Sequence, residues 1–130
     1  MSKTDDDSVS PFKGKTGARR VVQALFNSLA GLADAWRGES AFRQELLLSA
    51  VLIPVACWVQ VTRIERAALI ASVLLVLIVE LLNSSVEAAI DRISFDRHQL
   101  SRRAKDLGSA AVLMALMLLA VVWTLVLLYR

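Results

Sequence analysis

The sequence predicts an all-α integral membrane protein with three transmembrane helices and one N-terminal amphipathic helix on the membrane surface. Of its 130 residues, 56% are hydrophobic, and the mean hydropathy is +0.56. This composition is typical of membrane proteins and not of soluble domains. The sequence pI near 9.5 does not indicate a nucleic-acid-binding protein. The Lys and Arg residues flank apolar segments and form no basic face with interleaved aromatic residues.

The polar N-terminal part and the rest of the chain are predicted to behave differently. Residues 1–17 contain almost no apolar side chains, so we expect a disordered tail that cannot bury enough surface to order itself. Residues 18–130 are expected to form one membrane domain, which begins with the surface helix at 18–38. In that helix the apolar residues recur every three or four positions, and its basic start and Trp36 suit a membrane surface.

Three apolar segments follow, and we expect transmembrane helices at about 42–61, 67–90 and 109–129. About 20 apolar residues, each rising about 1.5 Å, cross the hydrocarbon core of a bilayer. The first segment contains Pro54, which is tolerated in a membrane helix because neighbouring groups satisfy the freed carbonyl. The one cysteine, Cys57, has no second cysteine for a disulfide, so we expect it to be buried as a small hydrophobe.

The positive residues beside the spans predict the orientation in the membrane. Seven Lys or Arg precede Leu46, where the apolar run of the first span begins; two lie between the first and second spans, five lie between the second and third, and one follows the third. Cytoplasmic segments carry the excess of Lys and Arg. We therefore expect the N-terminus and a loop at 91–108 to lie in the cytoplasm.

Polar residues form one stripe on the second span. Around a helix, Glu80, Asn83, Ser84 and Glu87 project at about 0°, 300°, 40° and 340°, and Asp91 continues the stripe at about 20°. An ionised carboxylate facing lipid is unfavourable by at least about 2.5 kcal/mol, so such groups face a cavity, a partner or an ion pathway. A polar helix interface is an alternative. The two glutamates, however, need counter-charges that no other span supplies, and a cation from outside the chain would supply them.

Two further polar clusters lie on the same predicted side. The first precedes the first span and runs from Glu39 to Glu45. The second lies in the predicted loop and consists of His98, Arg102, Arg103, Lys105 and Asp106. A basic loop beside two carboxylates suits a magnesium nucleotide, because Mg²⁺ is usually held by one or two carboxylates together with substrate phosphates. Lys105 is the candidate point charge for phosphate, whereas arginines in a cytoplasmic loop are expected from topology alone.

Three motifs resemble those of the prokaryotic diacylglycerol kinases. They are Glu39-x-x-Phe42-Arg43-Gln44-Glu45, the stretch ELLNSSVEAAIDR from Glu80, and the stretch AKDLGSAA from Ala104. The resemblance runs from about Gly17 to Tyr129, with the motifs in the expected order on matching membrane elements. It implies a kinase that transfers the γ-phosphate of MgATP to the hydroxyl of 1,2-diacylglycerol, giving phosphatidic acid and ADP. It also implies a homotrimer in the bacterial cytoplasmic (inner) membrane, with active sites shared between neighbouring subunits.

The resemblance also implies roles for individual residues. Glu80 is the implied catalytic base, which accepts the proton of the lipid hydroxyl, while Glu39 and Glu87 hold the Mg²⁺. Asn83 and Asp91 support this centre. The implied ATP-binding residues are Arg20, Glu39, Glu87, Asp96, His98, Lys105 and Asp106. The implied lipid-binding residues are Arg20, Trp36, Phe42, Arg43, Gln44, Glu45, Glu80 and Ser109. The sequence departs from the family pattern at Asn27, Asp96, Arg97 and Arg102.

Two alternative functions remain open at this point. A kinase of the same fold that acts on undecaprenol would use the same catalytic stripe, although the Glu39–Glu45 segment is more similar to the diacylglycerol branch. A membrane transport or scaffold protein without enzymatic activity would use Glu80 and Glu87 to conduct ions or to hold helices together. That function predicts ion flux without ATP hydrolysis, and it leaves Lys105 and Asp106 unexplained.

Overall fold

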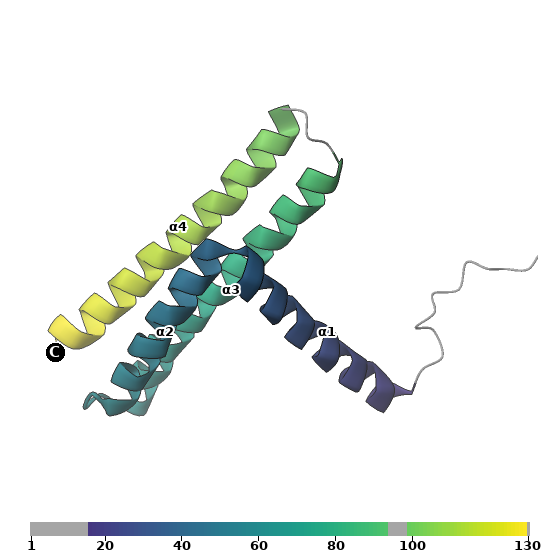
Figure 1. Ribbon diagram of the computed structural model, residues 1–130. Coiled ribbons are helices and arrows are strands. Elements are labelled where there is room, and N and C mark those ends of the chain that lie inside the picture. The colour runs from purple at the N-terminus through teal and green to yellow at the C-terminus, as the bar shows by residue number, and fades with distance from the viewer. Residues whose placement is uncertain (1–15, 94–98, 130) are drawn as a thin grey trace, which may run out of the picture. The chain divides into compact units, whose positions relative to one another are not determined.

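The computed structural model describes residues 16–93 and 99–129, which form α-helices and contain no strand. The helices are α1 (Gly17–Gly38), α2 (Ser40–Trp58), α3 (Arg63–Ile93) and α4 (Gln99–Leu128), as Figure 1 shows. The chain divides into two units, one ending at Asp34 and one beginning at Ala35. The predicted all-α class, with one N-terminal helix and three long apolar helices, is confirmed.

Helix α1 is amphipathic and exposed along almost its whole length. One face carries exposed apolar side chains, namely Val21, Val22, Leu25, Phe26, Leu29 and Leu32. An apolar stripe of this kind, opposite a polar face, is suited to lie in the membrane interface. The helix begins one residue before the predicted start of the surface helix.

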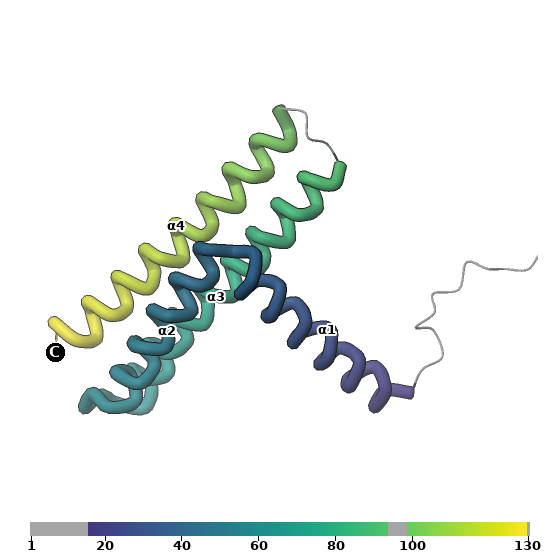
Figure 2. Tube along the Cα trace, viewed as in Figure 1, coloured from purple at the N-terminus to yellow at the C-terminus, as the bar shows by residue number. Residues whose placement is uncertain are grey.

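Helix α3 packs against both α2 and α4 and therefore forms the centre of the second unit. Figure 2 shows α3 and α4 running alongside each other. The buried residues of α3 recur every three or four positions: Leu69, Ser72, Val73, Val76, Glu80 and Asn83. A helix buries one face in this way when it packs against neighbours on that side. The indole N–H of Trp123 on α4 reaches this face and donates to Ser72 Oγ (3.2 Å) and to the Leu69 carbonyl (3.3 Å).

The helices α2, α3 and α4 are long and apolar enough to cross a membrane. Many of their large apolar side chains are exposed within the single chain, including Leu47, Val51, Leu74, Ile78, Met114, Met117 and Val121. Apolar surface on this scale is not tolerated in water. It fits a chain whose helices are covered by lipid or by neighbouring subunits.

The turn between α2 and α3 is held by side chains that satisfy the helix ends. Thr62 and Glu65 form a capping box, in which Thr62 N donates to Glu65 Oε2 (2.8 Å) and Glu65 N donates to Thr62 Oγ1 (3.1 Å). The Arg66 guanidinium donates to the carbonyls of Ala56 (3.0 Å) and Val59 (2.9 Å) at the end of α2. These contacts join the two helices at the end of the unit remote from Glu80.

The predicted loop at 91–108 is wrong. Helix α3 continues to Ile93, and α4 begins at Gln99, so most of the supposed loop is helical. The reason is local: residues 99–107 contain no proline or glycine. Gly108 lies inside α4, where a glycine is less favourable than alanine by only about 1 kcal/mol. Consequently Lys105 and Asp106 lie on the second turn of a helix.

Two other expectations differ from the structure. Helix α2 runs through Pro54 as expected but ends at Trp58, before the predicted end at residue 61. Cys57 was expected to be buried, yet it is exposed. Within this chain α2 packs mainly against α3, so a residue on the other faces of its last turn has no neighbour to cover it.

Candidate active site

The polar stripe of α3 continues the buried face of the helix. Glu80 is 5% exposed and Asn83 is 9% exposed, whereas Glu87 is half-buried and Asp91 is exposed. The predicted stripe is therefore an interior surface at Glu80 and Asn83 and opens toward the end of the helix. A carboxyl group as enclosed as that of Glu80 needs a partner or a function, because burial of an uncompensated charge is strongly unfavourable.

The neighbours of Glu80 are other carboxyl groups. Glu45, on the second turn of α2, is a close neighbour of Glu80, and Glu39 and Glu87 also act on Glu80 electrostatically. Glu45 was predicted only as a lipid contact. The structure thus brings Glu80 and Glu87 of α3 near Glu45 of α2 and Glu39 at the N-cap of α2, and we call these four residues the carboxylate cluster.

Two buried polar atoms at this site have no hydrogen-bond partner among the described residues. They are Glu45 Oε2 and Asn83 Oδ1. Both atoms accept hydrogen bonds, and buried acceptors in folded proteins are nearly always paired. The site therefore has unused capacity for a donor or a cation.

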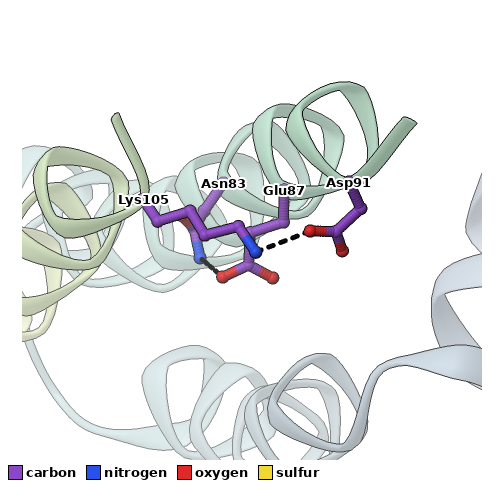
Figure 3. A network of polar contacts seen from close by, with 4 residues as sticks. All are labelled: Asn83, Glu87, Asp91 and Lys105. Carbon is purple, nitrogen blue, oxygen red and sulfur yellow. Dashed lines mark hydrogen bonds and ion pairs between the residues drawn. The ribbon is translucent and has the colours of Figure 1, made fainter. Parts of the chain in front are cut away.

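The outer part of the stripe is tied to α4. Figure 3 shows Asn83, Glu87 and Asp91 on α3 with Lys105 reaching across from α4. Asn83 Nδ2 donates to Glu87 Oε1 (3.4 Å), and Lys105 Nζ forms an ion pair with Asp91 Oδ1 (2.6 Å). The ammonium of Lys105 therefore neutralises part of the negative charge of the stripe.

Glu39 occupies the junction between α1 and α2. Its backbone is extended (φ −117°, ψ 106°), and its side chain makes no capping hydrogen bond to α2. Helix-type hydrogen bonds continue on both sides of this residue: Glu39 N donates to the Ala35 carbonyl (3.0 Å), and Arg43 N donates to the Glu39 carbonyl (3.1 Å). The carboxylate is thus not used to cap the helix and is available to the cluster.

Several predicted lipid contacts have structural roles in this chain. Arg43 Nη1 donates to the carbonyls of Trp36 (2.8 Å) and Arg37 (3.1 Å), which lack helical partners at the end of α1. Phe42 is buried at 2% exposure. Among the other residues predicted to contact lipid or nucleotide, four are exposed: Trp36, Gln44, Asp106 and Ser109. Their predicted contacts with lipid or nucleotide stay predictions.

Three predicted site residues do not belong to the described part of the unit that contains the cluster. Arg20 belongs to the first unit, and Asp96 and His98 lie outside the described residues. Within the described ranges, no three His, Cys, Asp or Glu side chains form a group that could hold a metal ion. The predicted Mg²⁺ ligands, Glu39 and Glu87, are therefore too few to enclose a cation by themselves.

These features define a small helical membrane protein whose central helix carries a buried acidic site open at one end. The family model of the prokaryotic diacylglycerol kinases matches residues 26–127. The diacylglycerol kinase of Pseudomonas aeruginosa is 57% identical over 121 residues, which cover 93% of this chain and 98% of the relative. That of Escherichia coli K12 is 48% identical over 112 residues, covering 86% and 92%. That of Helicobacter pylori 26695 is 41% identical over 113 residues, covering 87% and 88%. The chain belongs to the prokaryotic diacylglycerol kinase family, so the inferred resemblance is confirmed.

Proposed function

We propose that this chain transfers the γ-phosphate of ATP to the hydroxyl of 1,2-diacylglycerol, giving phosphatidic acid and ADP. The observation that carries the proposal, beside the family, is the enclosed carboxyl group of Glu80 on a membrane-spanning helix. An amphiphilic alcohol reaches such a group from the bilayer, and a nucleotide reaches the outer end of the stripe from water. This arrangement supports a site at which the two substrates of a lipid kinase meet.

Glu80 is proposed as the catalytic base. A carboxylate within hydrogen-bonding distance of the lipid hydroxyl accepts its proton as the oxygen attacks the γ-phosphorus. Glu87 lies two helical turns away, about 10 Å along the axis. This separation supports a role for the enclosed residue at the lipid hydroxyl and for the more exposed one at the phosphates. Asn83 lies between them, and its Nδ2 donates to Glu87 Oε1.

The carboxylate cluster is proposed to bind Mg²⁺ only together with ATP phosphates, because among the described residues no three acidic side chains form a group that could hold a metal ion alone. Its donors are all hard oxygen atoms, and its buried Glu45 Oε2 lacks a hydrogen-bond partner. Its acidic groups also repel one another without a counter-charge. Glu39 and Glu87 are the proposed ligands, with phosphates and water completing the coordination. When bound, Mg²⁺ neutralises charge on the phosphate oxygens during transfer.

The nucleotide is proposed to lie over the outer end of the stripe. Lys105 places a positive charge beside Glu87 and Asp91, where the phosphates would be, and Asp106 follows it on α4. Arg20, Asp96 and His98 are proposed to complete this site from parts of the chain beyond the cluster.

The protein is proposed to be a homotrimer of the inner membrane with the nucleotide side in the cytoplasm. The uncovered apolar faces of α2, α3 and α4 support an assembly of this kind.

The test is phosphate transfer from ATP by the detergent-purified full-length protein to diacylglycerol and, in parallel, to undecaprenol. Each reaction is run with and without Mg²⁺. We expect magnesium-dependent transfer to diacylglycerol. Preference for undecaprenol would keep the mechanism and change the substrate. Absence of transfer to either lipid by a well-folded oligomer would overturn the proposal and favour the transport or scaffold function.

A further inference from the structure

One glycine of the chain is in close contact with the site. If Gly108 on α4 carried a Cβ, that atom would collide with Asn83 Oδ1 and would lie 3.2 Å from Asn83 Cγ. The other glycines of the described ranges are Gly17, Gly31 and Gly38, and a Cβ at any of them would meet nothing within 4 Å. The absence of a side chain at Gly108 therefore has a specific consequence, which is room for the carboxamide of Asn83.

The carboxamide of Asn83 is held from one side only. Its Nδ2 donates to Glu87 Oε1 at 3.4 Å, which is a long hydrogen bond, and its Oδ1 is buried against α4 without a partner. A single weak hydrogen bond does not fix the rotation of an amide. The surface of α4 at Gly108 must therefore determine where the carboxamide lies.

We propose that Gly108 is a positioning residue of the kinase, which acts through Asn83 on Glu87. The bare backbone at Gly108 admits Asn83 Oδ1 and so aims Nδ2 at the carboxylate of Glu87. This inference rests on the proposed function, in which Glu87 serves the phosphates. A purely structural role is the competing explanation, because small residues also let membrane helices approach each other.

The two explanations predict different effects of Gly108→Ala. The atom that the new Cβ meets is the far end of a side chain, whereas no backbone atom of α3 lies within reach of it. Asn83 can therefore rotate away while the helices keep their spacing, and alanine is the better helix former. Positioning predicts an assembled, stable protein with reduced turnover. A spacing role predicts loss of assembly or stability.

The position of Asn83 can be observed directly, without the reaction. The sequence contains two asparagines, Asn27 and Asn83, so asparagine-selective ¹⁵N labelling in detergent gives two side-chain amide signals. Asn27 lies on α1, where its Oδ1 accepts from Gln23 Nε2, and it serves as the internal control. We expect Gly108→Ala to shift the Asn83 signal and to leave the Asn27 signal in place. An unmoved Asn83 signal would overturn the contact.

The kinetic test is a double-mutant cycle. Gly108→Ala should lower kcat about tenfold, the size expected for misplacing one hydrogen bond to a charged group, and should leave the KM for diacylglycerol unchanged. The control Gly31→Ala, where the Cβ meets open space, should keep wild-type kcat. Asn83→Ala removes the atoms that collide and leaves only Asn83 Cβ, at 3.9 Å. In that background Gly108→Ala should therefore cause no further loss.

Each remaining outcome is decisive. Additive losses in the double variant, or wild-type kcat in Gly108→Ala, would refute the positioning role. If Gly108→Ala fails to assemble, restored assembly in the double variant supports the contact, and continued failure refutes it. If the wild-type protein transfers no phosphate at all, the proposed function fails. The amide signals then still decide whether Gly108 positions Asn83.

Discussion

Replacing Glu80 by Gln isolates the charge of the enclosed carboxylate, because the two side chains have nearly the same shape. Loss of a general base lowers a rate by about 10²- to 10⁴-fold, which corresponds to about 3 to 5 kcal/mol of transition-state stabilisation. We expect the upper part of this range. Glu80 is only 5% exposed, so bulk water has little access to replace it as proton acceptor.

The same substitution, Glu80→Gln, should not lower the stability of the protein. Glu80 neighbours Glu45 and is repelled by Glu39 and Glu87, so removal of its charge should leave the thermal midpoint in detergent unchanged or higher. The matched control is Glu65→Gln, at the far end of the same helix. Glutamine preserves the capping box there, so both activity and midpoint should be kept. Turnover of Glu80→Gln within tenfold of the wild type would refute the assignment of Glu80 as base.

Two further predictions follow from the contacts between α3 and α4. Lys105→Ala should raise the KM for ATP about tenfold because a charge is removed from the proposed phosphate site. Its thermal midpoint should hardly change, since Lys105 and Asp91 are exposed and such pairs add little stability; an unchanged KM in steady-state kinetics would contradict this role. Trp123→Phe removes the indole donor to Ser72 and should lower the free energy of unfolding by about 1 kcal/mol. Thermal denaturation in detergent measures this change, and turnover per folded protein should stay at the wild-type level.

The helical class and the stripe could be predicted because they depend on local patterns. Hydropathy alone marks three long apolar segments, and the 3.6-residue period alone places Glu80, Asn83 and Glu87 on one face of a helix. These properties need no knowledge of which helix packs against which. The orientation in the membrane also depends on charge counts alone, and it stays a prediction.

The contacts across helices could not be predicted. The proximity of Glu45 to Glu80 depends on how α2 packs on α3, and the ion pair of Lys105 with Asp91 depends on the register of α4 against α3. The supposed 91–108 loop shows the limit of hydropathy: a polar stretch next to a span looks like a loop although it continues the helix. Gly108 belongs to the AKDLGSAA motif, but nothing in that motif indicates a contact with Asn83, since a glycine in a polar stretch is ordinarily a turn residue.

One buried face of α3 carries both the residues that pack against α4 and the proposed catalytic base. From Leu69 to Val76 the face is mostly apolar and holds α4 through Trp123. From Glu80 onward the same face is polar, yet Glu80 and Asn83 are nearly as buried as the apolar residues before them. Helix packing therefore encloses the proposed base without any separate binding domain. In the proposed arrangement the contacts that fix α4 on α3 also determine the positions of Asn83 and Glu87.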